Sequence, residues 1–153
     1  MGRVAQGLRT GVLAILACGV LPGWSFDLQG HRGARGLAPE NTLAAFERAL
    51  EIGVSTLELD VAITADGVAV VSHEPALFEG VARDAQGQWL GERGPLIRSL
   101  TLAQVQSYDV GRLNPAHAYG RQFPAQGPRD DQRVPTLASV FARVKVLGAT
   151  DVQ

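Results

Sequence analysis

The sequence predicts an α/β fold, with a parallel sheet covered by crossover helices, and three observations support this. First, a short apolar stretch leads into a Gly-rich loop and then an amphipathic helix. Second, an alternating strand follows that helix and turns back as a hairpin. Third, another amphipathic helix comes after a long irregular segment. This order is typical of the opening of an α/β protein.

Composition fits a single soluble domain and gives no sign of a nucleic-acid partner. The chain has 153 residues, of which 46% are hydrophobic and 19% charged, and its net charge is −1. A protein of this length has room for one domain. Because the basic residues are scattered, we expect no nucleic-acid binding, and any phosphate specificity must come from one site.

The first 25 residues predict a secretory signal peptide. Arg3 and Arg9 precede an apolar run at 11–21, and small residues follow it. The run is well below the roughly 20 residues that a spanning helix needs, so we expect no stable membrane span after cleavage. The mature protein would then be exported, to the periplasm or outside the cell. A lipoprotein signal ending at Cys18, the only cysteine, is the alternative.

The mature chain begins with a short predicted strand at 26–30 that leads into His31. After the Gly-rich loop, Asn41 or Thr42 stands where a helix N-cap belongs. Leu43, Phe46 and Leu50 then recur at helical spacing, which predicts an amphipathic helix with one buried face. Gly53 is placed to end it.

Residues 56–61 alternate between apolar and polar side chains, which predicts one continuous strand. Asp66–Gly67 is a tight-turn signal, so the chain is expected to return along 68–72 as a hairpin. That places His73 at the end of the returning strand, near Glu58 and Asp60.

The remainder divides into an irregular segment at 76–135 and a second helix. The predicted helix begins after Pro135–Thr136 and ends at Gly148. Its expected inward-facing residues are Leu137, Val140, Phe141, Val144 and Leu147. A third strand should begin about where the sequence ends, so we expect the chain to be a fragment of a larger sheet.

Glu58 and Asp60 are candidate metal ligands. Two residues apart on one strand, both side chains would leave the same face, with α-carbons about 6.5 Å apart. Carboxylates that converge repel unless a cation lies between them, and oxygen ligands favour Mg²⁺ or Ca²⁺. An ordinary solvent-facing strand edge and a glycosidase pair are the alternatives.

The other candidate site residues are His31 and His73, for proton transfer, and Arg32, for phosphate binding. Each histidine lies near a predicted strand end, where α/β active sites collect, and two imidazoles could divide general acid and general base work. Arg32 could hold a phosphate through its fork of donors. Structural or surface roles remain open for all three, since spacing alone does not decide between them.

A family resemblance adds roles to these residues. The chain resembles the N-terminal portion of glycerophosphodiester phosphodiesterases of the exported, periplasmic type, and residues 112–126 are also similar to exported members. The motifs that carry the resemblance are HRG at 31–33, PENT at 39–42, AF at 45–46, ELD at 58–60, DG at 66–67 and SHEP at 72–75.

The resemblance implies a (β/α)8 TIM barrel, of which only the first two or so strands lie in this chain. It also implies metal-dependent hydrolysis of small-molecule glycerophosphodiesters to sn-glycerol 3-phosphate and an alcohol, with Ca²⁺ or Mg²⁺ as cofactor. Residue by residue, His31 and His73 match the acid/base pair, Arg32 the phosphate-binding arginine, and Glu58 and Asp60 two metal carboxylates.

Two departures from the family pattern bear on activity. Glu74 stands where the family usually has Asp, and the family's third metal carboxylate and a nearby lysine lie on a strand beyond Gln153. The segment 76–135 matches the family's insertion after its second strand, within a predicted domain at 26–153. The alternatives are an inactive fragment that keeps phosphate- and metal-binding groups, or a phosphodiesterase acting on other lipid headgroups.

Overall fold

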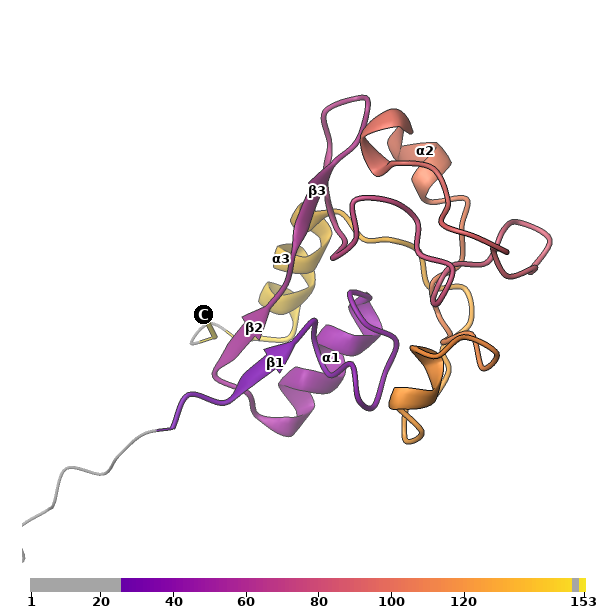
Figure 1. Cartoon of the computed structure of the whole chain (residues 1–153). Helices are drawn as coiled ribbons and strands as arrows, with labels where there is room; N and C mark the ends of the chain where they lie inside the picture. The colour runs from indigo at the N-terminus through magenta and orange to yellow at the C-terminus, as the bar shows by residue number, and fades with distance from the viewer. Residues whose placement is uncertain (1–25, 150–151) are drawn as a thin grey trace, which may run out of the picture.

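The computed structural model describes residues 26–149 and 152–153. The predicted signal peptide at 1–25 lies outside the described residues. The described part contains two small sheets, one parallel and one antiparallel, with helices beside them (Figure 1). The strands are β1 (Gln29–His31), β2 (Thr56–Glu58), β3 (Val61–Ile63) and β4 (Ala69–Val71).

Helix α1 (Leu43–Ile52) forms where the sequence predicts it. The Thr42 side chain caps its first turn by accepting a hydrogen bond from the Ala45 N–H, and Gly53 ends it in the left-handed conformation at φ 88°. Phe46 and Ala49 on its inner face are buried. The helix joins β1 to β2, which pair in parallel with His31 opposite Glu58.

The prediction of one continuous strand at 56–61 is wrong. β2 ends at Glu58, and β3 starts a separate sheet at Val61 by pairing antiparallel with β4. The physical reason is the loss of a neighbour, because Arg32 adopts φ 52° and turns the chain away just after β1. Glu58 and Asp60 therefore do not lie on one strand, and alternation alone does not show where a partner strand stops.

The predicted hairpin is confirmed, and β4 separates two hydrophobic cores. β3 and β4 are joined by a turn in which Gly67 has φ 80°. Val70 and Val71 are both fully buried but point to opposite faces of β4. Val70 belongs to a core formed with the segment 76–134, whereas Val71 packs with Phe46 and Val140.

The segment after β4 is mostly irregular, as expected, but it is held together by charged contacts. Arg83 binds both Asp109 at 3.0 Å and Asp130 at 2.6 Å, and Arg112 also pairs with Asp130. The Arg112 hydrogen bond, followed by that of Arg83, holds the pKa of Asp130 well below its usual range. Its short elements are η1 (Ile97–Ser99), α2 (Leu102–Val105) and η2 (Gly120–Gln122).

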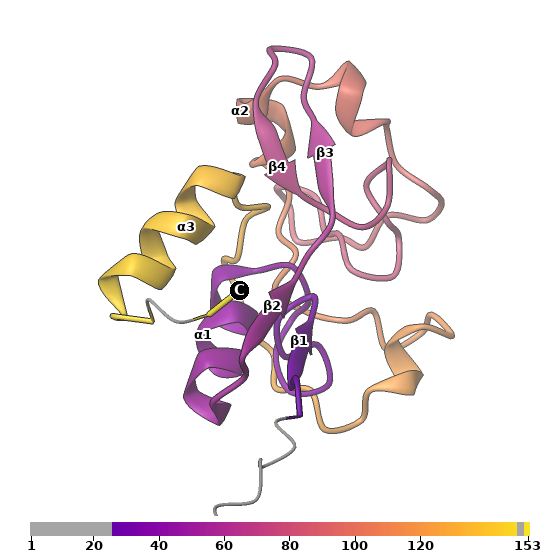
Figure 2. The same cartoon turned by 90° about the vertical axis from the view of Figure 1, so that its left-hand side faces the viewer.

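Helix α3 (Leu137–Val146) is also present, although its predicted inward face is partly wrong. Val140 is buried, and Leu137 and Val144 pack against the same core as Phe46. Phe141 and Leu147, expected to face inward, are 64% and 46% exposed. The helix lies beside α1 and β4 (Figure 2). Because Phe141 and Leu147 are exposed, these neighbours cover only part of its apolar face.

The last residue lies against β2, as expected for the beginning of a third strand. Gln153 N–H donates to the Ser55 carbonyl at 3.0 Å, and the Gln153 carbonyl accepts from Leu57 N–H at 2.8 Å. This is the hydrogen-bond pattern of a parallel neighbour. Among the described residues, every helix is too short or too polar to cross a bilayer.

Candidate active site

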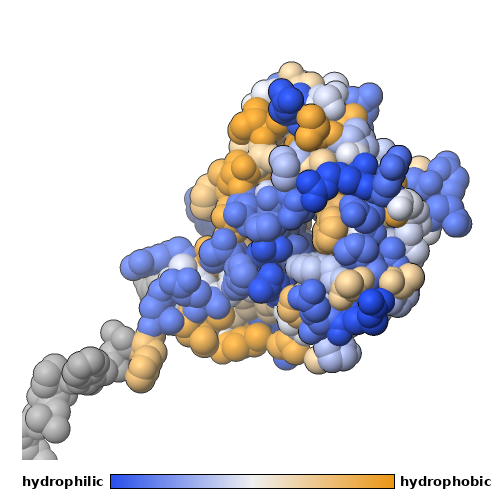
Figure 3. All heavy atoms as spheres, in the orientation of Figure 1, coloured by the Kyte–Doolittle hydropathy of each residue, from blue (hydrophilic) through white to orange (hydrophobic). Residues whose placement is uncertain are grey.

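The carboxyl ends of β1 and β2 carry the first two candidate residues. Both strands run toward the middle of the molecule, where hydrophilic side chains gather on the surface (Figures 1 and 3). His31 and Glu58 are paired in the parallel register, so their side chains leave the same face. His31 Nε2 lies 3.7 Å from Glu58 Oε2. The sequence-predicted acid/base candidate and metal candidate are thus direct neighbours.

Arg32 is held in an unusual backbone conformation next to this pair. Its φ of 52° is left-handed, which costs a residue with a Cβ roughly 1–2 kcal/mol relative to ordinary backbone. Two backbone bonds hold it, one from the Arg32 N–H to Glu58 Oε2 at 2.9 Å and one from the Asn41 N–H to the Arg32 carbonyl at 3.0 Å. Strain of this kind persists where surrounding contacts over-determine it and often marks a functional site.

The Arg32 guanidinium is buried among carboxylates, with only 11% of its side chain exposed. Nη1 donates to Glu40 Oε1 at 3.0 Å, and Nε lies 4.0 Å from Asp60 Oδ2. Both Nε and Oδ2 are buried and have no hydrogen-bond partner. Buried polar atoms are nearly always satisfied, so this pair leaves one donor and one acceptor available to a ligand.

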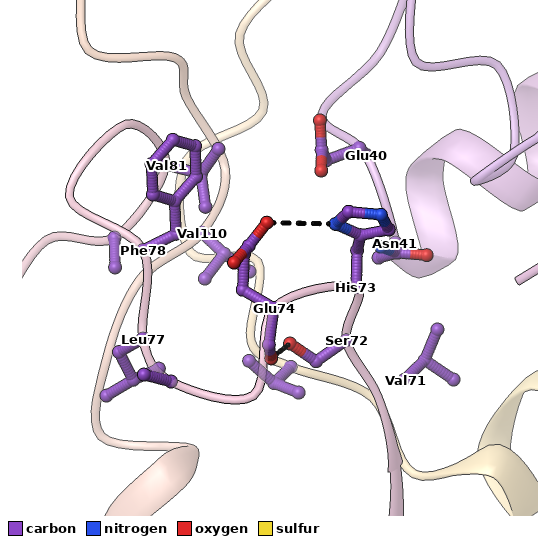
Figure 4. A pocket seen from close by; sticks show the side chains of 13 residues that line it. Glu40, Asn41, Val71, Ser72, His73, Glu74, Leu77, Phe78, Val81 and Val110 are labelled. Atoms are coloured by element: carbon purple, nitrogen blue, oxygen red, sulfur yellow. Dashed lines mark hydrogen bonds and ion pairs between the residues drawn. The ribbon is translucent and has the colours of Figure 1, made fainter. Parts of the chain in front are cut away.

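His73 lies at the end of β4, close to the same site. The Ser72 N–H donates to the Asp60 carbonyl at 3.0 Å, which brings the two segments together. The side chain of His73 bonds to Glu74, with Nδ1 3.0 Å from Oε1, and Glu74 also pairs with Arg93 at 3.3 Å. The Glu74 side chain therefore reaches back to its neighbouring histidine (Figure 4).

A small cavity of about 40 Å³ opens beside His73. Glu40 and Glu74 flank the imidazole on one side of the cavity, and apolar side chains form the opposite wall (Figure 4). The apolar wall includes Leu77 and Phe78. The cavity therefore places the His73 imidazole at its edge, opposite apolar side chains that exclude water from part of it.

The carboxylates suit a divalent cation in chemistry but do not complete a site. Glu58 and Asp60 can offer oxygen ligands, and the unpartnered Oδ2 of Asp60 is consistent with such a role. Within residues 26–149 and 152–153, no group of three or more His, Cys, Asp or Glu side chains is placed to hold a metal. Ca²⁺ and Mg²⁺ usually take six or more oxygen ligands, so two carboxylates are a partial set.

Two residues at the site were missed by the sequence reasoning. Glu40 is buried against Arg32, and Tyr119 reaches it from the long irregular segment, donating its hydroxyl to Glu40 Oε2. Burial, together with the Glu40 hydrogen bond, raises the pKa of Tyr119 from 10.0 to about 12. Glu40 lies inside the PENT motif, which was a usable signal, whereas nothing in the local pattern singled out Tyr119.

Comparison with known proteins gives consistent results. A sequence model of the glycerophosphoryl diester phosphodiesterase family matches residues 31–152. A glycerophosphodiester phosphodiesterase of Caldanaerobacter subterraneus is 36% identical over 111 residues, which are 72% of this chain and 37% of that protein. The rat glycerophosphodiester phosphodiesterase 1 is 37% identical over 109 residues, covering 70% and 27%.

Solved structures of other proteins are also similar to this chain. A glycerophosphoryl diester phosphodiesterase described as putative, from Silicibacter pomeroyi, matches with a TM-score of 0.78 and 41% identity, over 81% of this chain and 42% of that one. An Oleispira antarctica phosphodiesterase, solved with its product sn-glycerol-3-phosphate, matches with a TM-score of 0.55 and 28% identity, over 78% and 40%. The chain thus spans less than half the length of each of these relatives.

Proposed function

Because the chain belongs to the glycerophosphoryl diester phosphodiesterase family, we propose that it supplies part of the active site of an enzyme that hydrolyses glycerophosphodiesters to sn-glycerol 3-phosphate and an alcohol. The family's fold is a TIM barrel, and β1 and β2 correspond to its opening strands. One observation carries the proposal: Arg32 Nε and Asp60 Oδ2 form an ion pair at 4.0 Å, and both atoms are buried without a hydrogen-bond partner.

The two groups suit a phosphodiester together with a cation, one on the guanidinium and the other on the carboxylates. A phosphate oxygen on Arg32 would satisfy the free donor, and a divalent cation on Asp60 and Glu58 would satisfy the free acceptor. Such a cation, Ca²⁺ or Mg²⁺, would polarise the phosphodiester and offset the charge that develops on it. The Glu40 carboxylate next to Arg32 is already engaged by Nη1, so the rest of the fork stays available for substrate.

The two histidines would carry the proton transfers. Glu74 on Nδ1 of His73 favours the tautomer with its proton on that nitrogen, which leaves Nε2 to exchange a proton with substrate. His31 Nε2 is beside Glu58, and its side chain is 51% exposed and accessible. One imidazole would take a proton from the attacking hydroxyl, and the other would give one to the leaving oxygen.

A test uses the protein as its gene encodes it, with glycerophosphocholine as substrate and enzymatic detection of glycerol 3-phosphate. We expect EDTA to abolish release and added Ca²⁺ or Mg²⁺ to restore it. Asp60→Asn should raise the cation concentration needed for half-maximal activity, whereas Glu51→Gln, at an exposed carboxylate of α1, should not. Full activity in chelator would remove the metal role from Glu58 and Asp60.

A second candidate is a binding remnant that keeps the phosphate and metal groups without turnover. The observation that favours it is the partial ligand set, since the described residues gather no group of three metal-binding side chains. The same assay separates the two candidates. Binding of sn-glycerol 3-phosphate without hydrolysis of any glycerophosphodiester would support the remnant.

The N-terminal sequence supports export of the protein. Its basic start and short apolar run, before residue 25, are those of a secretory signal. Mass spectrometry of the protein recovered from cell fractions would test this. A mature N-terminus near residue 26 in the exported fraction is expected, and an uncleaved cytoplasmic product would contradict it.

A further inference from the structure

Tyr119 lies 87 positions after Arg32 in the sequence, yet its hydroxyl meets the Arg32 side chain. The hydroxyl donates to Glu40 Oε2 and lies 3.4 Å from Arg32 Nη1, which donates in turn to Glu40 Oε1 at 3.0 Å. The three side chains therefore form a closed ring of contacts. We name this group, Arg32, Glu40 and Tyr119, the arginine clamp.

The clamp engages only one end of the guanidinium. Nη1 carries both clamp contacts, whereas Nε has no hydrogen-bond partner although it is buried. An arginine fork is planar, so fixing one nitrogen fixes the direction of the others. The clamp thus orients the Nε donor toward the Asp60 carboxylate, 4.0 Å away.

Tyr119 is itself held by aromatic packing inside the long segment 76–135. Its ring meets Phe78 and Phe123 edge-on, with centroids 5.4 Å apart in both cases. Its backbone N–H donates to His117 Nδ1 at 3.2 Å. Edge-to-face aromatic pairs contribute beyond their buried area, so these contacts help to hold the ring in place.

From this geometry we propose that Tyr119 and Glu40 are positioning residues for Arg32, through which the segment 76–135 sets the affinity of the site for phosphate. Neither residue touches the reacting atoms, and each acts through the guanidinium. The inference rests on the proposed function, because it takes Arg32 as the phosphate-binding group.

The test measures binding of sn-glycerol 3-phosphate by calorimetry, with the protein as its gene encodes it. Tyr119→Phe removes only the hydroxyl and should weaken binding about tenfold. Tyr108→Phe is the matched control at the other tyrosine, which is packed against the core of Val70, and should change binding less than twofold. Glu40→Gln, which alters the clamp from the loop before α1 and leaves the sequence of the segment 76–135 unchanged, should also weaken binding.

A double-mutant cycle separates positioning from a general structural effect. In an Arg32→Lys background the fork is gone, so Tyr119→Phe should change binding less than twofold. An equal loss in both backgrounds would overturn the proposal, as would unchanged binding in Tyr119→Phe or no binding by the unmodified protein. If the unmodified protein binds the product but hydrolyses no glycerophosphodiester, the proposed function fails while the clamp still stands.

Discussion

At the scale of single residues, one carboxylate oxygen of the site contacts two other candidate residues. Glu58 Oε2 accepts from the Arg32 N–H and also lies beside His31 Nε2. One carboxylate oxygen therefore links the backbone of the phosphate-binding candidate to the acid/base candidate. Changes at any of these three residues should propagate to the other two.

Replacing His31 gives the first prediction at this scale. In the protein as its gene encodes it, His31→Ala should lower kcat by at least about a hundredfold, the usual scale of general acid–base catalysis. Steady-state kinetics with glycerophosphocholine measures this, and added imidazole should restore part of the rate. Near-normal turnover in a variant with an unchanged circular dichroism spectrum would remove His31 from the mechanism.

Tyr119 gives a prediction about pH. Its pKa is raised from 10.0 to about 12 in the folded protein, so the folded state holds the phenolic proton more tightly than the unfolded chain. The stability that Tyr119 contributes is therefore complete below pH 10 and is lost as pH rises toward 12. Denaturant unfolding at pH 8 to 11 should show the advantage over Tyr119→Phe shrinking above pH 10. Parallel stability curves would contradict it.

At the scale of elements, the loop after β1 packs directly on α1. The Ala34 N–H donates to the Ala45 carbonyl at 3.0 Å, so loop and helix are in backbone contact. A Cβ built on Gly33 would lie 2.6 Å from the Ala45 carbonyl carbon. Glycine at this position lets the helix approach the loop that carries Arg32.

Two glycine substitutions separate backbone conformation from this close approach. Gly33 and Gly53 both have positive φ, 77° and 88°, but nothing lies within 4 Å of a Cβ on Gly53. Gly53→Ala should cost about 1–2 kcal/mol of unfolding free energy, from conformation alone. Gly33→Ala should cost about 1–3 kcal/mol more, because it also overpacks the helix contact. Equal losses in urea titrations would mean that the contact relaxes freely.

Local sequence signals predicted where helices and turns form better than they predicted which elements pack against one another. Thr42 and Gly53 mark both ends of α1, and Asp66–Gly67 marks the hairpin, because caps and turns depend on adjacent residues. The break after Glu58 depends on where a distant strand ends, which no local pattern records. Phe141 fits the apolar period of α3 yet is exposed. Periodicity shows which residues form the apolar face of a helix, but it does not show how much of that face the neighbouring elements cover.

For the candidate site, too, local motifs indicated residues that lie close to them in the sequence but not the distant residues that contact them. The motifs named the five residues that the structure brings toward one region, but Asp60 reaches it from a connection between two sheets. Tyr119 was not predictable, because its place depends on how the segment 76–135 folds back. Contacts between residues so far apart in sequence are set by tertiary packing.

At the scale of the whole molecule, the two small sheets and three α-helices of residues 26–149 leave much apolar surface uncovered. Phe141, Val146 and Ile63 are 64%, 74% and 52% exposed. Two-stranded sheets are marginal unless other elements cover them. On the other side of β2 from β1, the described residues supply only the parallel bonds of Gln153.

The 153-residue chain expressed alone should therefore be poorly folded. We expect a broad thermal transition and strong binding of the dye ANS, which reports exposed apolar surface. Circular dichroism melts with parallel ANS titrations measure both. A single sharp cooperative transition without dye binding would show that the described contacts suffice for a stable fold.

The left-handed backbone of Arg32 also bears on sequence design. Judged by backbone preference alone, position 32 suits glycine or asparagine better than arginine. An automated redesign that rewards only backbone preference would therefore tend to replace Arg32. The designed loop would then relieve its backbone strain, but it would lose the guanidinium and leave the buried Glu40 without its ion pair. Anyone rebuilding this loop, here or in a protein with the same turn, should hold that position fixed and optimise the residues around it.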